Sequence, residues 1–380
     1  MEQNNIDKLR QMLNEKAKAA VDKSISKDGK LAADELDSLE QLSRLVKLVE
    51  SSQTKRRPNL WLLPALFLTT LIILSILLFG HVSETEIELD VTASDVSFEV
   101  PDQQVLTTLM QLTRLGIDGL NEIRIPRSQE EDSHTISSAD NGREILQVLI
   151  TPEKKETGSV SLSSVIVPVG TRVRIYPTEI ANQYGLSLTG SSVDLRAEIF
   201  GRIQMSFSDH RSMTYNFASP KAIVMTSDSQ EVRLVFSVAN DSIGAAFSSQ
   251  LAADELRLFQ IDEFVDQKNT IVRKVSTIHS GTLYLEELKG KEIQLRPREQ
   301  ISFKQSAGEI RTIRLNDNRV ELKYYGRVRG MDSGFGENKR NLMPTYLEWL
   351  SARHGLSLLW GATLYIFGII VGVLRWLEKV

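Results

Sequence analysis

Two long runs of uncharged, apolar residues constrain the fold of this chain more than any other feature of its sequence. The first covers residues 60–79 and the second covers residues 356–374. An α-helix rises about 1.5 Å per residue, so a run of about 20 residues can cross the ~30 Å hydrocarbon core of a bilayer. Helices buried in soluble proteins seldom continue this far without a charge, and a signal peptide would begin nearer the N-terminus. The sequence therefore predicts two transmembrane helices.

The charges beside the first run predict its orientation. Lys55, Arg56 and Arg57 precede this run, whereas it is followed by Glu84, Glu86, Glu88 and Asp90 with no Lys or Arg nearby. Because basic residues remain on the cytoplasmic side, both termini are predicted to be cytoplasmic and residues of about 81–355 to be extracytoplasmic. Tryptophan is enriched at membrane interfaces, and it stands near the ends of both runs as Trp61, Trp349 and Trp376.

The segment just before the second run is predicted to be a separate helix in the membrane interface. Residues 341–354 contain Pro344, which suits a first helical turn, and an apolar face around Trp349. Gly355 would separate this interfacial helix from the spanning helix.

The second apolar run also carries a ridge of small residues at helical spacing. Small side chains let two helices approach closely, as in the GxxxG pattern that Gly368 and Gly372 form. The ridge is predicted to pack either against the chain's own first helix or against a second copy of the chain. Neither run contains a charge, so neither helix by itself indicates an ion pathway. The predicted helix-packing residues are Ser357, Gly361, Gly368 and Gly372.

The N-terminal segment contains two amphipathic patterns separated by the turn SKDGK. Apolar residues recur every three or four positions over residues 6–20 and again over 36–49, which predicts a helical hairpin. Residues 24–35 have the spacing of an EF-hand loop, but serines replace two acidic ligands, and Lys27 and Lys30 add positive charge. The segment is therefore interpreted as a docking or assembly element. Its second helix carries a near-heptad seam that would pair with the first helix or with a partner.

Beyond the first apolar run the hydrophobic period changes from 3.6 to 2, which is typical of strands. Short strands bounded by Gly, Pro, Asn and Asp predict a sandwich or barrel over residues 81–240, with one helical interruption at 102–112. After the polar stretch 240–250, regular alternation over 251–335 predicts an antiparallel meander. One face of this meander is expected to be buried, with Leu283, Leu285, Ile293, Leu295, Ile301, Phe303, Val320, Leu322 and Tyr324.

No motif of catalysis or cofactor binding is found. The chain has no cysteine, and none of its five histidines has a second metal-ligand residue at helical or strand spacing. His279 alone, at a strand end beside serines, merits inspection. Acid pairs, Asp262 with Glu263 and Glu286 with Glu287, could serve a glycosidase only across a cleft of about 5–9.5 Å, which neighbours on a strand rarely form. The sequence therefore predicts no catalytic residue, no metal site and no cofactor.

Basic residues are dense in the last block, between residues 296 and 329, where acidic residues are interleaved with them. Mixed charge of this kind is typical of a solvated strand face. An anionic polymer or lipid headgroups are the alternative partners.

These features predict a membrane-anchored α+β protein with an N-terminal helical hairpin and two transmembrane helices flanking a large all-β region of sandwich and meander type. We interpret the chain as a non-enzymatic protein of the bacterial inner membrane, an oligomerising scaffold or sensor that links a periplasmic β-region to a cytoplasmic protein partner. Membrane lipid and further copies of the chain are expected partners, and nucleic acid is not. The alternatives are a membrane-disturbing effector assembled through its transmembrane helices and a periplasmic carbohydrate-active enzyme. The predicted segments are 1–57 (cytoplasmic hairpin), 60–79 and 356–374 (transmembrane helices), 81–240 and 251–335 (β-regions), 341–354 (interfacial helix) and 375–380 (cytoplasmic tail).

Overall fold

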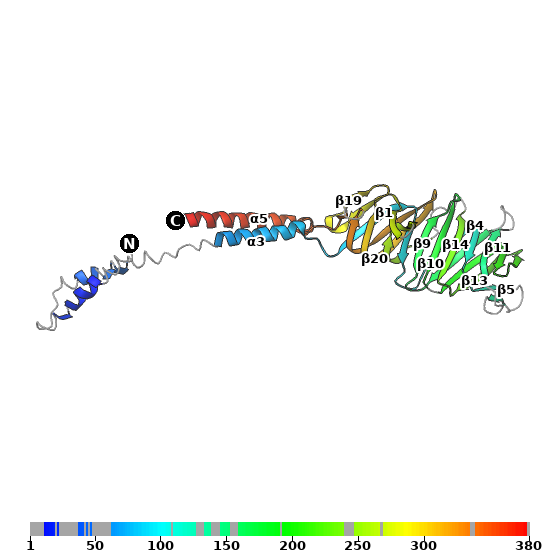
Figure 1. Cartoon of the computed structure of the whole chain (residues 1–380), viewed down its shortest axis with the longest axis horizontal. Coiled ribbons are helices and arrows are strands. Elements are labelled where there is room, and N and C mark those ends of the chain that lie inside the picture. Colours follow the sequence, from blue (N-terminus) through cyan, green and yellow to red (C-terminus); the bar gives the residue numbers. More distant parts are fainter. Residues whose placement is uncertain are drawn as a thin grey trace. The chain divides into compact units, whose positions relative to one another are not determined.

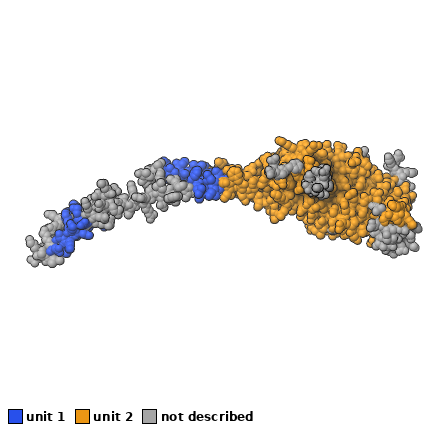
Figure 2. Space-filling model, in the orientation of Figure 1, with its two compact units in different colours: residues 1–74, 361–380 blue, residues 75–360 orange. Residues whose placement is uncertain are grey.

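The structure of the protein is a computed structural model with two compact units (Figure 2). One unit comprises residues 1–74 and 361–380, and the other comprises residues 75–360 and is called the β-unit. The described part of the first unit is helical, whereas strands dominate the β-unit (Figure 1). The structure describes residues 11–19, 21–22, 37–41, 43–44, 46–47, 62–107, 109–126, 133–137, 145–152, 159–190, 192–238, 247–266, 269–334 and 339–377.

The predicted N-terminal hairpin is described only in pieces. Residues 11–19 and 37–41 are helical and fall within or beside the two amphipathic patterns. The SKDGK turn lies outside the described residues, so the hairpin stays a prediction. The predicted membrane-interface residues Lys55, Arg56, Arg57 and Trp61 also lie outside the described residues.

Both apolar runs contain helix. The first forms α3 (Leu62–Phe79), and the second forms most of α5 (Tyr346–Leu377). Among the described residues, one helical stretch is long and apolar enough to cross a bilayer, Ser357–Leu374, whereas the apolar stretch of α3, Phe67–Phe79, is shorter. One helix of this chain could therefore span a membrane, and the second crossing stays a prediction.

α5 is interrupted where the sequence predicts a break between two helices. His354 has non-helical backbone angles of φ −132° and ψ 30°. The helix begins at Tyr346, so Pro344 precedes it and does not occupy its first turn as predicted. Thr345 caps the helix instead. Its hydroxyl accepts a hydrogen bond from Glu348 N–H (3.2 Å), and its own N–H donates to the Glu348 carboxylate (3.1 Å), which makes a capping box.

The β-unit is built from antiparallel strands. Their alternating burial, with apolar residues facing inward at every second position, explains why these segments form strands. The strands are β1 (Thr85–Ala93), β2 (Val96–Glu99), β3 (Gln104–Val105), β4 (Met110–Asp118), β5 (Glu122–Pro126), β6 (Ser133–Ser137), β7 (Ile145–Pro152), β8 (Ser159–Val167), β9 (Arg172–Pro177), β10 (Gln183–Thr189), β11 (Val193–Phe207), β12 (Ser212–Asn216), β13 (Lys221–Ser227), β14 (Glu231–Val238), β15 (Leu251–Arg257), β16 (Phe259–Asp266), β17 (Asn269–Ser276), β18 (Ile278–Leu285), β19 (Lys291–Leu295), β20 (Ile301–Asn316), β21 (Arg319–Ser333) and β22 (Arg340–Asn341).

Hydrogen bonding joins most of these strands into one continuous ribbon (Figure 1). From one edge, its order is β19–β18–β1–β21–β20–β15–β2–β9–β10–β14–β4. β7 and β8 both pair with β4 and with β11, and β11 pairs in turn with β12 and β13. β16 and β17 form a hairpin of their own.

β1 and β2, which precede the boundary predicted at residues 240–250, pair with strands that follow it. β1 lies between β18 and β21, and β2 lies between β15 and β9. The predicted regions 81–240 and 251–335 therefore share one ribbon. A slip of one residue would turn the buried side of β1 outward, so the apolar alternation fixes this register.

The helical interruption predicted at residues 102–112 is wrong. Among the described residues of this stretch, 104–105 form β3 and 110–112 begin β4, in which Met110 and Leu112 are buried and Gln111 is exposed. Their apolar spacing is locally compatible with a helix, but β4 pairs with β14, β7 and β8 and is therefore a strand. Tertiary context overrides a short local pattern in this way.

The buried face predicted for the meander is confirmed. Seven of its nine residues are buried, and Ile293 and Phe303 are half-buried against the same apolar core. Because this core also includes residues from β4, β10 and β14, strands from both predicted β-regions contribute to it.

Candidate functional site

The two ends of the β-unit meet where α3 ends and α5 begins. Val82 N–H donates a hydrogen bond to the Pro344 carbonyl (2.9 Å), and Tyr346 N–H donates to the Gly80 carbonyl (3.0 Å). Glycine is required at position 80, because a Cβ there would lie 2.5 Å from the Ile76 carbonyl oxygen and 2.8 Å from the Tyr346 ring. The chain therefore enters and leaves the β-unit at one place. We call this place the helix junction; it comprises Gly80, His81, Val82, Pro344, Thr345 and Tyr346, and His81 and Thr345 form an antiparallel bridge within it.

An ion pair ties the beginning of α5 to β19. Lys291 Nζ lies 2.8 Å from Glu348 Oε1, and both side chains remain partly exposed. Hydrogen bonding from Lys291, followed by that from Thr345 N–H, holds the pKa of the Glu348 carboxyl below its usual value. Glu348 therefore completes the cap of α5 and holds the helix against the β-unit.

The acid pair Glu286 and Glu287 has a structural role at the same place. Both residues lie in η1 (Glu286–Leu288), a short 3-10 turn after β18. The Glu287 side chain is only 16% exposed and lies 3.7 Å from the Arg353 guanidinium, which stacks 5.1 Å from the centre of the Trp349 ring. Glu287 thus contacts α5 and does not face a second carboxylate across a cleft. The two contacts Lys291–Glu348 and Glu287–Arg353 are called the helix straps.

A polar contact joins α3 to α5 within the helical unit. The Thr70 hydroxyl and the Tyr365 hydroxyl share a hydrogen bond. Hydrogen bonds between otherwise apolar helices are a recognised means of helix association in lipid.

The predicted ridge of small residues is open in the described part of the structure. A Cβ at Gly361, Gly368 or Gly372 would meet no described atom within 4 Å, and Ser357 is exposed. Gly361 precedes Tyr365 by four positions, and Gly368 and Gly372 follow it by three and seven. Residues at these spacings lie on one side of a helix, so the glycines share the side of α5 that carries Tyr365. The ridge therefore lies beside the contact with α3 but is not filled by it.

The outer face of β1 and β21 carries a ladder of opposite charges. Glu86 pairs with Arg327 (3.0 Å) and Asp90 pairs with Lys323 (2.9 Å), in the register of the two strands. Two of the four acids that follow the first apolar run are thus paired closely with basic residues of the last block, and Glu84 lies 4.0 Å from Arg329. These pairs favour a solvated strand face as the role of Lys323, Arg327 and Arg329.

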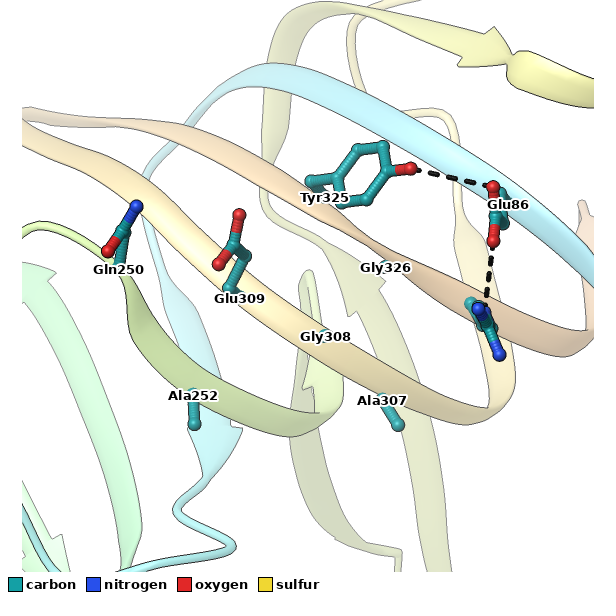
Figure 3. A pocket seen from close by; sticks show the side chains of 9 residues that line it. Glu86, Gln250, Ala252, Ala307, Gly308, Glu309, Tyr325 and Gly326 are labelled. Atoms are coloured by element: carbon teal, nitrogen blue, oxygen red, sulfur yellow. Dashed lines mark hydrogen bonds and ion pairs between the residues drawn. The ribbon is translucent and has the colours of Figure 1, made fainter.

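An open cavity of about 430 Å³ lies on this face, between β1, β21, β20 and the start of β15 (Figure 3). Tyr325 and Glu86 point toward each other across it, and their oxygens are 3.5 Å apart. The Glu86 carboxylate raises the pKa of the Tyr325 phenol. The cavity holds no histidine, serine or threonine, and its arginine is paired; it is lined by Glu86, Gln250, Ala252, Ala307, Gly308, Glu309, Tyr325, Gly326 and Arg327.

The remaining chemical candidates are not brought together. His279 is largely exposed, and partial desolvation of its ring, followed by the charge of Arg319, lowers its pKa. The nearby Ser276 hydroxyl donates to the Glu299 carbonyl (2.7 Å) and is not available as a nucleophile. Among the described residues, no group of three or more histidine or carboxylate side chains is placed to hold a metal ion.

Comparison with known proteins does not assign this site. No model of a known protein family matches the chain, and no curated protein sequence matches it. The helix junction and its straps are therefore evaluated on geometry alone.

Sequence reasoning missed two features that the structure reveals. The capping box follows the pattern Thr-x-x-Glu at residues 345–348, which a search for helix starts could have found. The charge ladder has no comparable local signal, because β1 and β21 lie far apart in the sequence.

Proposed function

We propose that this chain is a non-enzymatic, two-pass protein of the bacterial inner membrane that works as an oligomerising scaffold or sensor. The helix junction is the observation that carries this proposal. It joins both ends of the β-unit by backbone hydrogen bonds, and the helix straps connect α5 to η1 and β19. A change in the β-unit would thus reach the membrane helices directly.

Helix lengths support a second crossing by α3. Measured from the junction at 1.5 Å per residue, Thr70 lies about 15 Å back along α3, whereas Tyr365 lies about 28 Å along α5, of which about 17 Å follow the kink at His354. Thr70 and Tyr365 would therefore lie at equal depth in a bilayer whose surface is near this kink. Among the described residues, only Ser357–Leu374 is long enough to cross a bilayer. The proposed second crossing therefore uses the complete first apolar run, residues 60–79.

The proposed topology places residues of about 81–355 in the periplasm and both termini in the cytoplasm. Lys55, Arg56 and Arg57 support this orientation through their charge. Residues 1–57 would then bind a cytoplasmic protein, while the open ridge on α5 would contact lipid or another copy of the chain.

The absence of cysteine makes the topology directly testable. Single variants Lys16→Cys and Glu179→Cys place one thiol at an exposed position in the N-terminal segment and one in the β-unit. A membrane-impermeant maleimide should label Glu179→Cys in intact spheroplasts and should label Lys16→Cys only after lysis. Equal labelling of both variants before lysis would exclude the two-pass orientation.

The scaffold is tested separately by mass measurement after extraction in a mild non-ionic detergent. We expect a multiple of the 42.7 kDa chain mass, or a copurifying cytoplasmic protein that is lost when residues 1–57 are removed. A lone monomer without a partner would contradict the proposal. Collapse of the membrane potential on expression would favour the effector alternative.

A further inference from the structure

A second cavity of about 390 Å³ lies on the β-unit away from the helix junction. Its volume is near the lower end of the range of small-molecule sites, about 300–1,000 Å³. Strands β15, β16, β17, β20 and β21 all contribute to its wall. Its lining comprises Glu255, Leu256, Arg257, Phe259, Ile261, Lys274, Ser302, Phe303, Lys304, Gln305, Asp332 and Lys339.

The cavity lies where two neighbouring strands separate. β15 and β20 are paired at Asp254 opposite Ala307 and again at Arg257 opposite Ser302. Between these pairs, residues 255–256 of β15 face residues 303–306 of β20, so the ladder is interrupted. Interruptions of this type recur beside binding sites, where they redirect side chains.

The gap is held by specific groups. Leu256 N–H donates to the Ser306 hydroxyl (2.9 Å) in place of a ladder carbonyl. Glu255 and Gln305 both adopt left-handed backbone conformations, with φ of 48° and 50°. Non-glycine residues seldom adopt this region and persist in it where the surrounding structure maintains them. The interruption between β15 and β20 is thus stabilised by the fold itself.

The lining has an excess of positive charge. Two of its four cations are paired within the chain, since Lys304 lies 3.0 Å from Asp332 and Arg257 lies 2.7 Å from Glu255. Lys274 and Lys339 are both exposed, and neither has a carboxylate partner among the described residues. The whole chain has a formal net charge of −4, so this cationic cavity is not a consequence of general composition.

Apolar surface lies directly beside these two lysines. Phe303 is half-buried against the core, and the Ile261 side chain is 51% exposed. Lys274 Nζ lies 4.6 Å from the centre of the Phe259 ring, which positions the ammonium group over an aromatic face. Charge and apolar area therefore occur together in one opening.

We infer that this cavity binds a small amphiphilic anion, with an acidic group at Lys274 and Lys339 and an apolar body against Phe259, Phe303 and Ile261. The acidic group forms charge-assisted hydrogen bonds with the two ammonium groups. The body covers apolar surface that is now exposed to water. This inference does not depend on the proposed membrane topology, because all the residues that carry it belong to the β-unit.

Calorimetric titration of the full chain in uncharged maltoside micelles tests the inference with three soluble probes. Phenyl phosphate combines an acidic group with an apolar body, inorganic phosphate lacks the body, and phenol lacks the charge. Phenyl phosphate is expected to bind at least about tenfold more tightly than either of the others, since each part contributes separately. Equal affinity of inorganic phosphate would overturn the amphiphilic assignment, and absence of phenyl phosphate binding would overturn the site.

Variants locate the binding. The double variant Lys274→Gln/Lys339→Gln and the single variant Ile261→Asp should each weaken phenyl phosphate binding by about tenfold or more. Lys221→Gln on β13 is the matched control and should leave affinity unchanged. All four substituted side chains are at least partly exposed, and thermal unfolding checks that each variant is folded. Unchanged affinity in both cavity variants would show that the probe binds elsewhere and would refute the inference.

Discussion

Tyr324 and Gly326 form the most sharply defined packing contact in the β-unit. The Tyr324 ring is fully buried, and Gly326 lies opposite Gly308 in the register of β21 and β20. A Cβ on Gly326 would overlap the Tyr324 hydroxyl and would lie 2.6 Å from its Cζ atom and 2.7 Å from the Ala307 carbonyl oxygen. The glycine is therefore required by the neighbouring tyrosine and by the opposing backbone.

The Tyr324 hydroxyl is itself in an unfavourable position. No hydrogen-bond partner reaches it in the described structure, and burial raises the pKa of this phenol. The Ser306 side chain lies close enough to the phenol to oppose this rise in pKa, although its hydroxyl, which accepts the hydrogen bond of Leu256 N–H, does not reach full hydrogen-bond geometry with Tyr324. A buried polar group without a partner costs about 1–3 kcal/mol.

These observations predict a coupled pair of substitutions. Gly326→Ala should lower the free energy of unfolding by about 1–3 kcal/mol, the usual cost of overpacking. Tyr324→Phe keeps the ring and removes the unpaired hydroxyl, so its stability should equal or exceed that of the wild type. In the Tyr324→Phe background the nearest obstacle to the new methyl group is gone, and Gly326→Ala should cost less by about 0.5–2 kcal/mol.

The wild type, the two single variants and the double variant are compared by thermal unfolding of the full chain in detergent. Unfolding is monitored by the circular dichroism signal of the strands. For a unit of this size, 1 kcal/mol corresponds to a shift in Tm of about 2–4 °C. Gly116→Ala is the control, because a Cβ there would meet only the Val235 carbonyl oxygen at 3.7 Å. That variant should match the wild type or be more stable by up to about 1 kcal/mol. Additive effects of the two substitutions, or a Tyr324→Phe variant less stable than the wild type, would refute the reasoning.

Three further predictions concern the helix junction and α5. Because the pKa of Glu348 is lowered in the folded state, its stabilising effect is present above the ordinary carboxyl pKa and is lost as the pH falls through the lowered value. The fall in Tm between pH 7 and pH 3 should therefore be larger for the wild type than for Glu348→Gln. Because the ion pair is exposed, the difference should correspond to less than about 1 kcal/mol. Parallel plots of Tm against pH for the two proteins would contradict this prediction. Gly80→Ala should lower Tm or increase protease cleavage at the helix junction, since its Cβ would overlap the Tyr346 ring, and an unchanged profile would show that the contact yields freely. Gly368→Leu should leave insertion and the β-unit intact but reduce oligomer mass in detergent if the ridge joins two copies, whereas unchanged assembly would assign the ridge to lipid.

Local periodicity was sufficient to predict the types of most elements. The alternation of Leu283, Leu285, Val320 and Leu322 identified a buried face, because side chains of a strand point to opposite sides at successive positions. The same reasoning failed at residues 102–112, where a short apolar pattern fits a helix and a strand equally and the pairing partners decide.

Long-range pairing could not be predicted from one sequence. Nothing in β1 indicates that its partners are β18 and β21, since its alternation would suit any neighbouring strand. The helix straps share this difficulty, because Lys291 and Glu348 belong to different predicted segments and their ion pair exists only once β19 meets α5. Such contacts follow from topology, and several topologies are compatible with the same local patterns.

The pairing of β1 with β21 limits how the helix junction can transmit a signal. β1 follows α3 closely, and α5 follows β21 and β22, so a sliding movement of one helix along the other would shear the β1–β21 ladder. A shift of one residue would turn Leu89 and its buried neighbours out of the core, which makes a small sliding movement far more costly than breaking an exposed ion pair. The helix straps are partly exposed and can break without disturbing the core, and the backbone already leaves helical geometry at His354. A conformational change that crosses the junction would therefore tilt or rotate α5 about His354, with the straps opening and the β1–β21 register retained.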